Sequence, residues 1–543
     1  MGPVVIPIPE SGKMFDVLIE NGRILDGCGN PWFRGDIGIQ EGRIVQIGAL
    51  RGKKAKTQID AQDWIVAPGF IDIHCHCDAV PFVSPREEGR ILQGITTETI
   101  GNCGVSLAPV ESATLGILQK YVAPFCFEAP LEWNWRTLSD FLDRIEKRQS
   151  FTNIASWVGH GTVRIAVMGM DNRRPTAKEL SQMKQRIGQS MDDGAFGLSS
   201  GLIYPPGVYS DPEEMIELCK TVAEKGGVYT THIRNEYDLV LEAVKEAIEV
   251  AEQSGAPTII AHHKTAGKRN WGKSRQTLQL IAEARQRGTD IVCDAYPYEA
   301  GSTFLWAVLP PWAQEGGIGK MLERLRSPSD RKRIKENFIL GIPGWPNLVE
   351  GSGWEGIMVS SCKRNMGWEG KTIQQIALAR QVDPADALLD ILLEEEAEVL
   401  MVIFGMAEED VAAILKHPAV MVGSDAIPSV GKPHPRFFGT FPRILGKYVR
   451  EGQTLELSEA VRKMTSMPAQ RLGLPDRGKI QIGMWADIVI FDPQAIGDRA
   501  TYADPRQYPT GIHYVLVNGQ IAVQHGKTTG ILAGKVLRKK PCQ

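Results

Sequence analysis

The sequence lacks the features of several common protein classes. No stretch is apolar over the roughly 18 positions needed to cross a bilayer, and the start, MGPVVIPIPESGKMFDVLIE, has no basic leader followed by an uninterrupted apolar run. A Walker loop, a dinucleotide-binding fingerprint and a GxSxG elbow are also missing. We therefore expect neither a secreted nor a membrane protein, and no nucleotide-dependent chemistry.

Cysteine and excess charge are scarce as well. The 543 residues include 9 cysteines, an odd number, and one of them lies inside the motif HCH, which argues against a disulfide framework and favours a reducing cytoplasm. Lysine and arginine (61) nearly balance aspartate and glutamate (64), which gives a formal net charge of -3. That balance gives no indication of an overall positive charge that would attract nucleic acid or an anionic membrane. We expect small-molecule partners, and the sequence leaves open whether the chain forms a homo-oligomer.

What the sequence does contain is enough apolar residues, 43%, for a large core in more than one domain. Both ends are rich in β-branched runs separated by turn dipeptides, at Asn21-Gly22 and Glu41-Gly42 near the start and Asn518-Gly519 near the end. We predict that 1–64 and 470–543 together form a small flanking β domain that resembles a sandwich.

Between these ends, short apolar runs alternate with helical patterns, as in an α/β protein with a parallel sheet. Continuous hydrophobicity is typical of strands that are covered on both faces. We predict a TIM-like (β/α)8 barrel over 65–469, with eight strands within 65–76, 96–104, 153–161, 195–201, 228–234, 258–264, 291–298 and 419–426.

The gap between the seventh and eighth predicted strands, 299–418, is far longer than an ordinary helical crossover. We therefore predict an insertion at about 303–365. It could form a lid over the mouth of the barrel or a decoration at its edge.

Five potential metal ligands lie at the ends of these predicted strands. His74 and His76 are two positions apart on one strand, so their side chains point to the same side. Cys103, His232 and His262 end later strands and make a Cys/His/His set, which leaves a zinc ion one open position. The carboxyl ends of barrel strands meet at one rim, where active sites of such barrels are built. We predict a catalytic metal site there.

The same rim should carry a general base and a basic residue. Asp425 ends the last strand in MVGSDAIP, where a carboxylate beside a metal site can take up and return a proton. Strand alternation allows only one of His262 and His263 to face inward, and Lys264 shares the face of His262. Lys264 could polarise a carbonyl group, hold a substrate anion, or form a salt bridge at the rim.

Two further residues could contact a substrate. Arg436 lies in the proline-rich segment GKPHPRFFGTFPR, and its planar guanidinium suits a carboxylate. Tyr296, in DAYPY after the seventh strand, could donate to an oxyanion or simply pack as an aromatic residue. His160 also ends a predicted strand, but its sequence context indicates no specific role.

At this point the sequence resembles the amidohydrolase superfamily and, within it, the D-aminoacylase or N-acyl-D-amino-acid deacylase group. The motif PGFIDIHCH is shared across the superfamily, whereas GNCGVSLAP and HPRFFGTFPR are more specific to the deacylase branch. The other matching segments are FDVLIENGRILDG, GLSSGLIYPPGVYS, THIRNE, AHHKTAGKRNWGKS, VGSDAIP, KMTSMPAQRLGL and GMWADIVIFDP.

The resemblance implies zinc-dependent hydrolysis of N-acyl-D-amino acids to a carboxylic acid and a free D-amino acid. It implies that Cys103, His232 and His262 bind a principal Zn²⁺, and that His74, His76 and Asp425 surround a second, weaker metal position. Asp425 would be the catalytic base, and Lys264, Tyr296 and Arg436 would face the substrate.

The resemblance also bears on the position that bridges the two metal sites. The fourth strand offers Ser199 and Ser200 instead of the modified lysine of hydantoinase-like relatives, so Cys103 would take the bridging place.

Other functions remain open from the sequence. The chain could open a cyclic amide, as dihydroorotase or hydantoinase relatives do, or deformylate an N-substituted formamide. From a different class, it could be a catalytically silent scaffold. Retention of the whole polar ligand set argues against that, because a scaffold has no need of buried polar groups.

Overall fold

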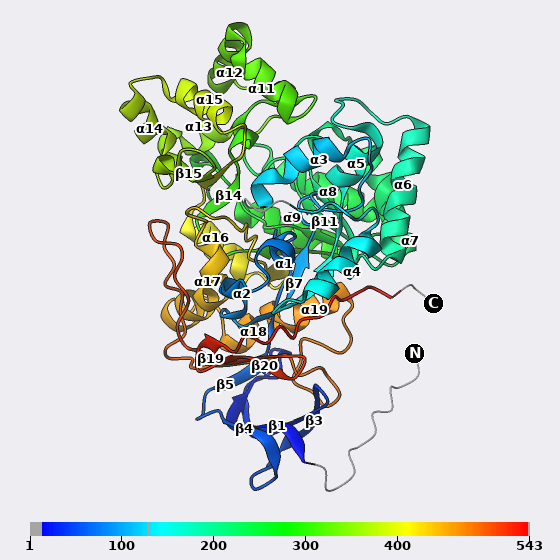
Figure 1. The fold of residues 1–543 in the computed structure, drawn as a ribbon, viewed down its shortest axis with the longest axis vertical. Coiled ribbons are helices and arrows are strands. Elements are labelled where there is room, and N and C mark those ends of the chain that lie inside the picture. The colour runs from blue at the N-terminus through cyan, green and yellow to red at the C-terminus, as the bar shows by residue number, and fades with distance from the viewer. Residues whose placement is uncertain (1–13, 127–130, 541–543) are drawn as a thin grey trace.

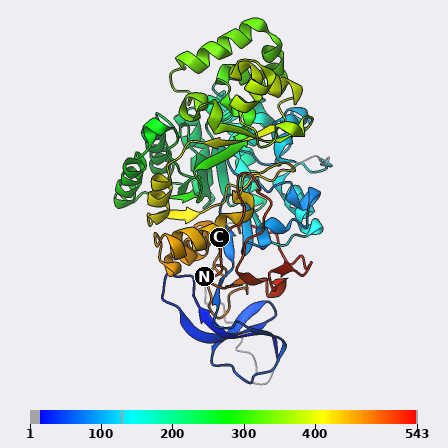
Figure 2. The same ribbon diagram turned by 90° about the vertical axis from the view of Figure 1, so that its left-hand side faces the viewer.

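The computed structural model describes residues 14–126 and 131–540. Three parts follow one another along the longest axis of the molecule: a β-sheet at one end, a barrel in the middle, and a largely helical insertion at the other end (Figures 1 and 2). Within the described ranges, no helix combines the length and the apolar character needed to cross a membrane.

The sheet at one end, here called the terminal sheet, combines strands from both ends of the chain, as predicted. Its order is β21-β20-β19-β18-β5-β1-β2-β3, and β4 also pairs with β1. β5 pairs with β1 on one side and β18 on the other, so it joins the two halves. The strands are β1 (Phe15–Ile24), β2 (Phe33–Gln40), β3 (Arg43–Gly48), β4 (Ala55–Asp60), β5 (Ile65–Pro68), β18 (Ile488–Phe491), β19 (Ile512–Val517), β20 (Gln520–Gln524) and β21 (Lys527–Thr528).

Two of the three predicted turns are present. Glu41-Gly42 connects β2 to β3, and Asn518-Gly519 connects β19 to β20. The turn predicted at Asn21-Gly22 was wrong, because this dipeptide forms a bulge inside β1, where the pairing register with β2 shifts. A Cβ added to Gly22 would lie 2.6 Å from Cγ2 of Val66, so the strand contact with β5 requires glycine there.

The barrel consists of parallel strands in two arcs, β6-β7-β8 and β9-β10-β11-β12-β13-β17. Trp157 separates β8 from β9, and its N–H donates to the carbonyl of Ile100 at 2.9 Å. On the other side, a parallel bridge between Cys75 and Ala426 closes the ring. The strands are β6 (Phe70–Asp72), β7 (Ile95–Ile100), β8 (Asn153–Ser156), β9 (Val158–Gly159), β10 (Gly197–Gly201), β11 (Val228–His232), β12 (Thr258–Ile260), β13 (Ile291–Ala295) and β17 (Val420–Val422).

Helices cover the outside of this ring. α7 is capped by the Asp211 side chain, and α8 ends at Gly255, which has the left-handed φ of 72° that favours glycine. The helices of the barrel and its loops are α1 (Val80–Val83), α2 (Glu88–Ile91), α3 (Leu115–Val122), α4 (Leu138–Arg148), α5 (His160–Met168), α6 (Ala177–Asp192), α7 (Pro212–Glu224), α8 (Val240–Ser254), α9 (Ser274–Gln286), α16 (Glu408–Lys416), α17 (Arg436–Arg443), α18 (Leu457–Met464) and α19 (Ser466–Leu472).

The first predicted barrel strand, 65–76, is two strands in the structure. β5 belongs to the terminal sheet, and only β6 enters the barrel. Gly69 lies between them, and a Cβ added there would lie 2.2 Å from Cγ2 of Thr96. The chain therefore passes from one sheet to the other where a side chain of β7 packs directly against its backbone.

The insertion extends from β14 to β16, further than the predicted 303–365. β14 (Ala300–Phe304) and β15 (Ile357–Cys362) both pair antiparallel with β16 (Val399–Phe404). These pairings join segments far apart in the sequence, so no local pattern marks the end of the insertion. Its helices are α10 (Pro311–Gln314), α11 (Ile318–Arg326), α12 (Pro328–Leu340), α13 (Leu348–Ser352), α14 (Ile373–Arg380) and α15 (Pro384–Glu394).

Candidate active site

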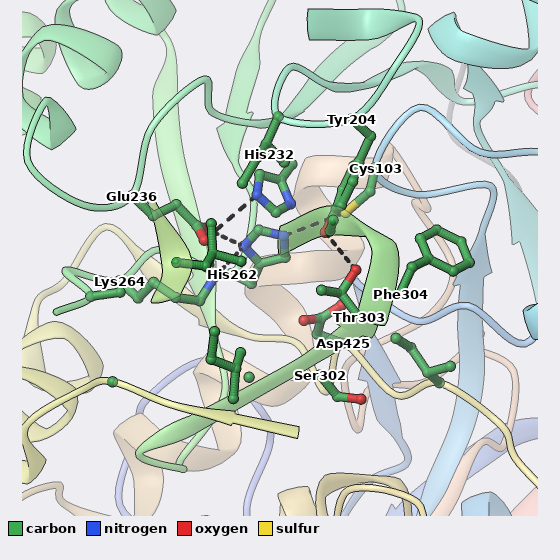
Figure 3. Close-up of a pocket in the computed structure, with 18 of the residues that line it drawn as sticks. Cys103, Tyr204, His232, Glu236, His262, Lys264, Ser302, Thr303, Phe304 and Asp425 are labelled. Atoms are coloured by element: carbon green, nitrogen blue, oxygen red, sulfur yellow. Dashed lines mark hydrogen bonds and ion pairs between the residues drawn. The ribbon is translucent and has the colours of Figure 1, made fainter. Parts of the chain in front are cut away.

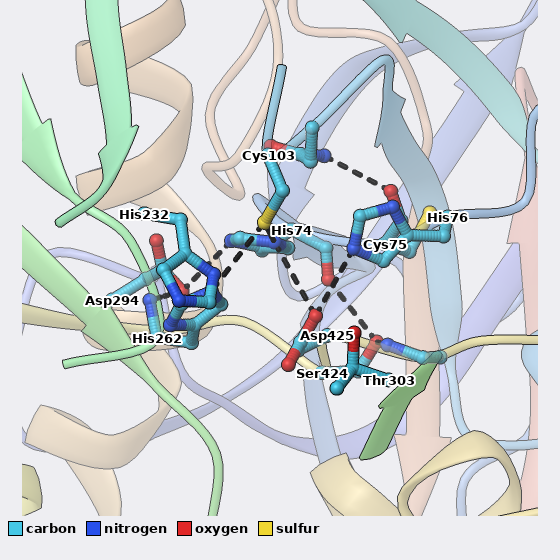
Figure 4. A network of polar contacts seen from close by, with 12 residues as sticks. His74, Cys75, His76, Cys103, His232, His262, Asp294, Thr303, Ser424 and Asp425 are labelled. Atoms are coloured by element: carbon cyan, nitrogen blue, oxygen red, sulfur yellow. Dashed lines mark hydrogen bonds and ion pairs between the residues drawn. The ribbon is translucent and has the colours of Figure 1, made fainter. Parts of the chain in front are cut away.

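The predicted metal ligands meet at one end of the barrel, although their positions in the sequence are far apart. All of them are buried, and each follows or ends a barrel strand (Figure 4). They form two groups whose ligand atoms lie within 4.8 Å of one another: His74, His76, Cys103 and Asp425 in one, and Cys103, His232 and His262 in the other.

Cys103 belongs to both groups and lies between them. Its Sγ is 3.4 Å from Nε2 of His74 and 3.4 Å from Nε2 of His262. Burial opposes ionisation of the thiol, but the imidazoles of His74 and His262 outweigh burial and hold the pKa of Cys103 well below its ordinary value. The site therefore favours the thiolate, which is the form that binds a metal.

The backbone at three of these residues is in the left-handed region. The φ angles are 51° at Cys103, 35° at His262 and 51° at Asp425. Residues other than glycine rarely adopt such angles, and the surrounding structure has to hold them there. The unusual conformation turns the side chains toward one another as the strands end.

Asp425 joins the His74 and His76 side of the site to an arginine. Its Oδ1 is 3.4 Å from Nε2 of His74 and 3.2 Å from Nε2 of His76, and its Oδ2 is 2.8 Å from Nη1 of Arg436. Burial opposes ionisation, but Arg436 and His262 outweigh it and hold the pKa of Asp425 well below its ordinary value. Asp425 is therefore a carboxylate at neutral pH.

Arg436 lies deeper than its sequence context indicated. It was expected in a loop, but it is the first residue of α17 and has 0% of its surface exposed. Besides its ion pair with Asp425, it donates from Nη2 to the carbonyl of Ser302 at 3.0 Å. It does not line the pocket described below, so in this structure its carboxylate partner is Asp425.

Lys264 and Tyr296 do line the pocket. Nζ of Lys264 is 2.7 Å from Nδ1 of His262, on the same side of the chain as strand alternation predicted. It also lies 5.5 Å from the centre of the Tyr296 ring, and the guanidinium of Arg436 lies 4.7 Å from the same ring. Both cations therefore lie close to the ring of Tyr296.

The other histidines of the region point elsewhere. Nε2 of His263 contacts Oγ1 of Thr277 on α9 at 2.8 Å, so His263 faces the outer helix as expected. His160 begins α5, and its Nε2 is 2.8 Å from Oε1 of Glu214, which also pairs with Arg164. His160 therefore takes part in a buried ion-pair network away from the candidate ligands.

Glu236 is the main site residue that the sequence did not reveal. Its Oε1 lies 3.1 Å from Nδ1 of His262 and 2.6 Å from Nζ of Lys264, and its Oε2 lies 3.5 Å from Nε2 of His232 (Figure 3). A histidine whose Nδ1–H donates to a carboxylate keeps its lone pair on Nε2, here the nitrogen that faces Cys103. Glu236 lies four residues after His232, in the motif THIRNE, and this spacing was the signal in the sequence that could have indicated its role.

Replacing this carboxylate by an amide, Glu236→Gln, should weaken zinc binding about 10- to 100-fold while the fold persists, because such carboxylates orient the ligating imidazole and raise its basicity. Zinc titration against a chromogenic chelator measures this. Asp238→Asn is the matched control, since Asp238 is exposed and contacts Asn270 instead of a candidate ligand. Equal zinc affinity in Glu236→Gln and the native protein would contradict the assignment.

Asp294 plays a similar part for His74. Its Oδ1 lies 3.3 Å from Nδ1 of His74 and accepts the backbone N–H of His262 at 2.9 Å. Asp294 lies within β13 and is 1% exposed. It thus contacts two ligand-bearing segments from the strand beside them.

A third cluster of potential ligands, Cys75, Cys77 and Glu98, lies next to the first two. Nε of Arg90 donates to Oε1 of Glu98 at 2.5 Å, and the same guanidinium pairs with Asp72. The arginine already supplies the positive charge in this buried cluster. We therefore assign it to the structural support of β6 and β7.

The pocket beside the candidate ligands encloses about 740 Å³ of space, including its opening. The barrel loops supply one side, and the insertion supplies Gly301, Ser302, Thr303 and Phe304 on another. Figure 3 shows Lys264 and Glu236 on one side of the candidate ligands and Phe304 on the other.

Comparison with known proteins places this geometry in a family. The chain matches the sequence profile described as the amidohydrolase family over residues 57–328 and 364–523. The chain belongs to the amidohydrolase family. The internal segment left unmatched, 329–363, lies within the insertion. The match covers the barrel of this amidohydrolase and strands β5, β18 and β19 of the terminal sheet, whereas β1, β2 and β3 precede it.

Individual relatives are similar over nearly the whole length. D-aminoacylase of Alcaligenes xylosoxydans xylosoxydans is 35% identical, over 97% of this chain and 98% of the relative. N-acyl-D-glutamate deacylase of the same organism is 36% identical, over 97% of each. The crystal structure of N-acyl-D-glutamate deacylase from Bordetella bronchiseptica, with zinc and a phosphonate inhibitor, superposes with a TM-score of 0.81 at 34% identity, over 97% of this chain and 100% of the other.

Proposed function

We propose that this protein is a zinc-dependent deacylase that hydrolyses the amide bond of N-acyl-D-amino acids to a carboxylic acid and a free D-amino acid. The observation that carries the proposal is the convergence of Cys103, His232, His262 and Asp425 at the mouth of the barrel. The family match and the similarity to two deacylases over nearly the whole chain support the same activity.

The residues present fit a zinc ion. Buried polar atoms normally have hydrogen-bond partners, yet within the described chain neither ring nitrogen of His232 has one of normal geometry. A metal ligand needs such a free lone pair. Thiolate and imidazole are the donors that zinc prefers, so Cys103, His232 and His262 would hold the principal ion. His74, His76 and Asp425, with Cys103 shared, would hold a weaker second ion.

Zinc bound there would acidify a water molecule and polarise the substrate's carbonyl group. The chain supplies the proton transfers. Asp425 is ionised and lines the pocket, so it can take the proton of the attacking water and return it to the departing amine. Glu236 fixes the ring of His262, as its contacts with Nδ1 and with Lys264 indicate.

Lys264 and Tyr296 are the groups that face the substrate. Lys264 is the lysine on the pocket wall, and its ammonium suits either the substrate's carboxylate or the developing oxyanion. Burial raises the pKa of Tyr296 well above its ordinary value, so its phenol remains protonated and able to donate a hydrogen bond. Arg436 would act through Asp425, whose charge it balances.

Incubation of zinc-loaded protein with matched N-acetyl-D- and N-acetyl-L-amino acids tests the proposal. We expect release of the free amino acid from the D-substrates at least about 100-fold faster than from the L-substrates, since inversion at Cα moves the amide away from the catalytic groups when the carboxylate is held. Parallel assays should include a hydantoin and an N-substituted formamide. Turnover of these two alone, with none of the acylamino acids cleaved, would contradict the deacylase assignment.

A further inference from the structure

The pocket wall next to the candidate ligands is aromatic. The ring of His76 stacks against Phe125 with centroids 5.1 Å apart, and Phe125 in turn lies 4.3 Å from Phe304. Phe304 stacks on Trp306 with centroids 4.5 Å apart. Apolar surface therefore begins directly beside a candidate metal ligand and continues into the insertion.

Aliphatic residues complete this wall from both the barrel loops and the insertion. They are Val105, Ile203, Leu348, Ile403, Met406 and Ile427. A ligand group that enters this part of the pocket loses water and meets mainly carbon atoms, since the hydroxyl groups of Tyr204 and Thr303 beside Phe304 bond to each other at 2.8 Å. Such a surface stabilises apolar groups in proportion to the area they bury.

Positive charge in the pocket is limited. Among the described residues that line it, Lys264 is the single lysine or arginine, and its Nζ lies 2.6 Å from Oε1 of Glu236. Arg436 does not line the pocket, and its guanidinium group is paired with Asp425. The carboxylates of Glu236 and Asp425 also line the pocket, so its permanent charges are more negative than positive apart from any bound metal.

An N-acyl-D-amino acid already brings one carboxylate, which Lys264 can balance. A D-glutamate or D-aspartate substrate brings a second. That group would meet apolar side chains, neutral hydroxyl groups such as that of Ser302, or the negative charges of Glu236 and Asp425. A neutral hydroxyl group does not balance a charge, and burial of a carboxylate without a cationic partner is strongly unfavourable. This conclusion holds whichever of the acyl group and the side chain lies against the aromatic wall, because the described lining of the pocket includes one lysine and no arginine.

From these contacts we infer that the pocket selects N-acyl-D-amino acids with uncharged, apolar side chains, such as D-leucine, D-methionine and D-phenylalanine, and rejects D-glutamate and D-aspartate. The inference rests on the proposed deacylase function and specifies its substrate class. Overall identity does not separate these alternatives, since it is 35% to the D-aminoacylase and 36% to the N-acyl-D-glutamate deacylase. The charges and apolar residues that line the pocket do separate them.

The test compares kcat/KM of the zinc-loaded protein for the N-acetyl derivatives of D-leucine, D-methionine, D-glutamine and D-glutamate. D-glutamine and D-glutamate have nearly the same size and differ in charge. The ratio of their kcat/KM values therefore measures the effect of the side-chain charge alone. We expect D-leucine to exceed D-glutamate about 100-fold or more, and D-glutamine also to exceed D-glutamate. Equal or faster cleavage of the D-glutamate derivative would overturn the inference.

A binding measurement separates this inference from the proposed function. Calorimetry on the native zinc-loaded protein, titrated with the hydrolysis products, should detect D-leucine and fail to detect D-glutamate at the same concentration. If no substrate is cleaved by the native protein but this binding preference is present, the deacylase proposal fails and the pocket assignment stands. Tighter binding of D-glutamate than of D-leucine overturns the pocket assignment even if turnover is observed.

A charge introduced on the wall provides the converse test. Ile203 is partly exposed, so a longer side chain there can keep its charged end near water. Ile203→Arg should raise the ratio of D-glutamate to D-leucine cleavage about tenfold or more, because the second carboxylate gains a partner. Ile203→Met is the matched control without charge. The same ratio in both variants would count against selection by charge.

Discussion

Cys103→Ala is expected to leave the chain folded and to remove both its zinc and its activity. The thiol Sγ belongs to both candidate ligand groups, so a single substitution takes a ligand from each. Loss of the metal removes several kcal/mol of transition-state stabilisation, which corresponds to a decrease in turnover of about 1,000-fold or more. Metal analysis after dialysis, together with the deacylase assay and circular dichroism, measures the three quantities.

Cys219→Ala is the matched control for that substitution. Cys219 lies in α7 and is fully buried, as Cys103 nearly is, so both changes remove a similar volume from the interior. Burial raises the pKa of the Cys219 thiol, whereas the imidazoles lower that of Cys103. Native zinc content in Cys103→Ala, or equal zinc loss in both variants, would show that Cys103 is not a ligand.

The convergence of the candidate ligands could be predicted because of a property of parallel barrels. Successive strands point the same way, so residues at their carboxyl ends meet regardless of their distance in the sequence. Short apolar runs that end in His74, His232 or Asp425 were therefore sufficient to predict convergence. Strand alternation also separated His262 from His263, which contacts Thr277 on the outer helix.

The residues that support the ligands could not be predicted in the same way. Glu236 contacts His262 and Asp294 contacts His74, and in each pair the two residues come from different strands or the loops after them. Such contacts depend on how neighbouring strands align in the barrel, which no local sequence pattern shows. The extent of the insertion was also hidden, because β14 and β16 pair across a long segment without a local pattern. For Arg436, the composition of its segment indicated an accessible loop, whereas the structure buries it as the partner of Asp425.

Asp425→Asn should separate catalysis from metal binding. The amide keeps the shape of the side chain but cannot accept the proton of the attacking water, and general acid–base groups of this kind contribute about 10²- to 10⁴-fold to turnover. Cys103, His232 and His262 remain, so the principal zinc should stay bound. The variant therefore differs from Cys103→Ala: it is expected to lose turnover with its zinc in place.

Asparagine is chosen to replace Asp425 because Arg436 is paired with this side chain. Removing the carboxylate leaves a buried guanidinium without its ion-pair partner, and the amide oxygen of asparagine can still accept from it, whereas alanine cannot. Asp410→Asn controls for loss of a buried negative charge elsewhere, since Asp410 accepts the backbone N–H of Gly272 on the outside of the barrel. Zinc retained with turnover within tenfold of the native protein would exclude Asp425 as the base. Loss of zinc together with turnover would instead make Asp425 a ligand of the principal ion. Cys103, His232 and His262 are proposed to hold that ion without Asp425, so its release from the variant would contradict that proposal.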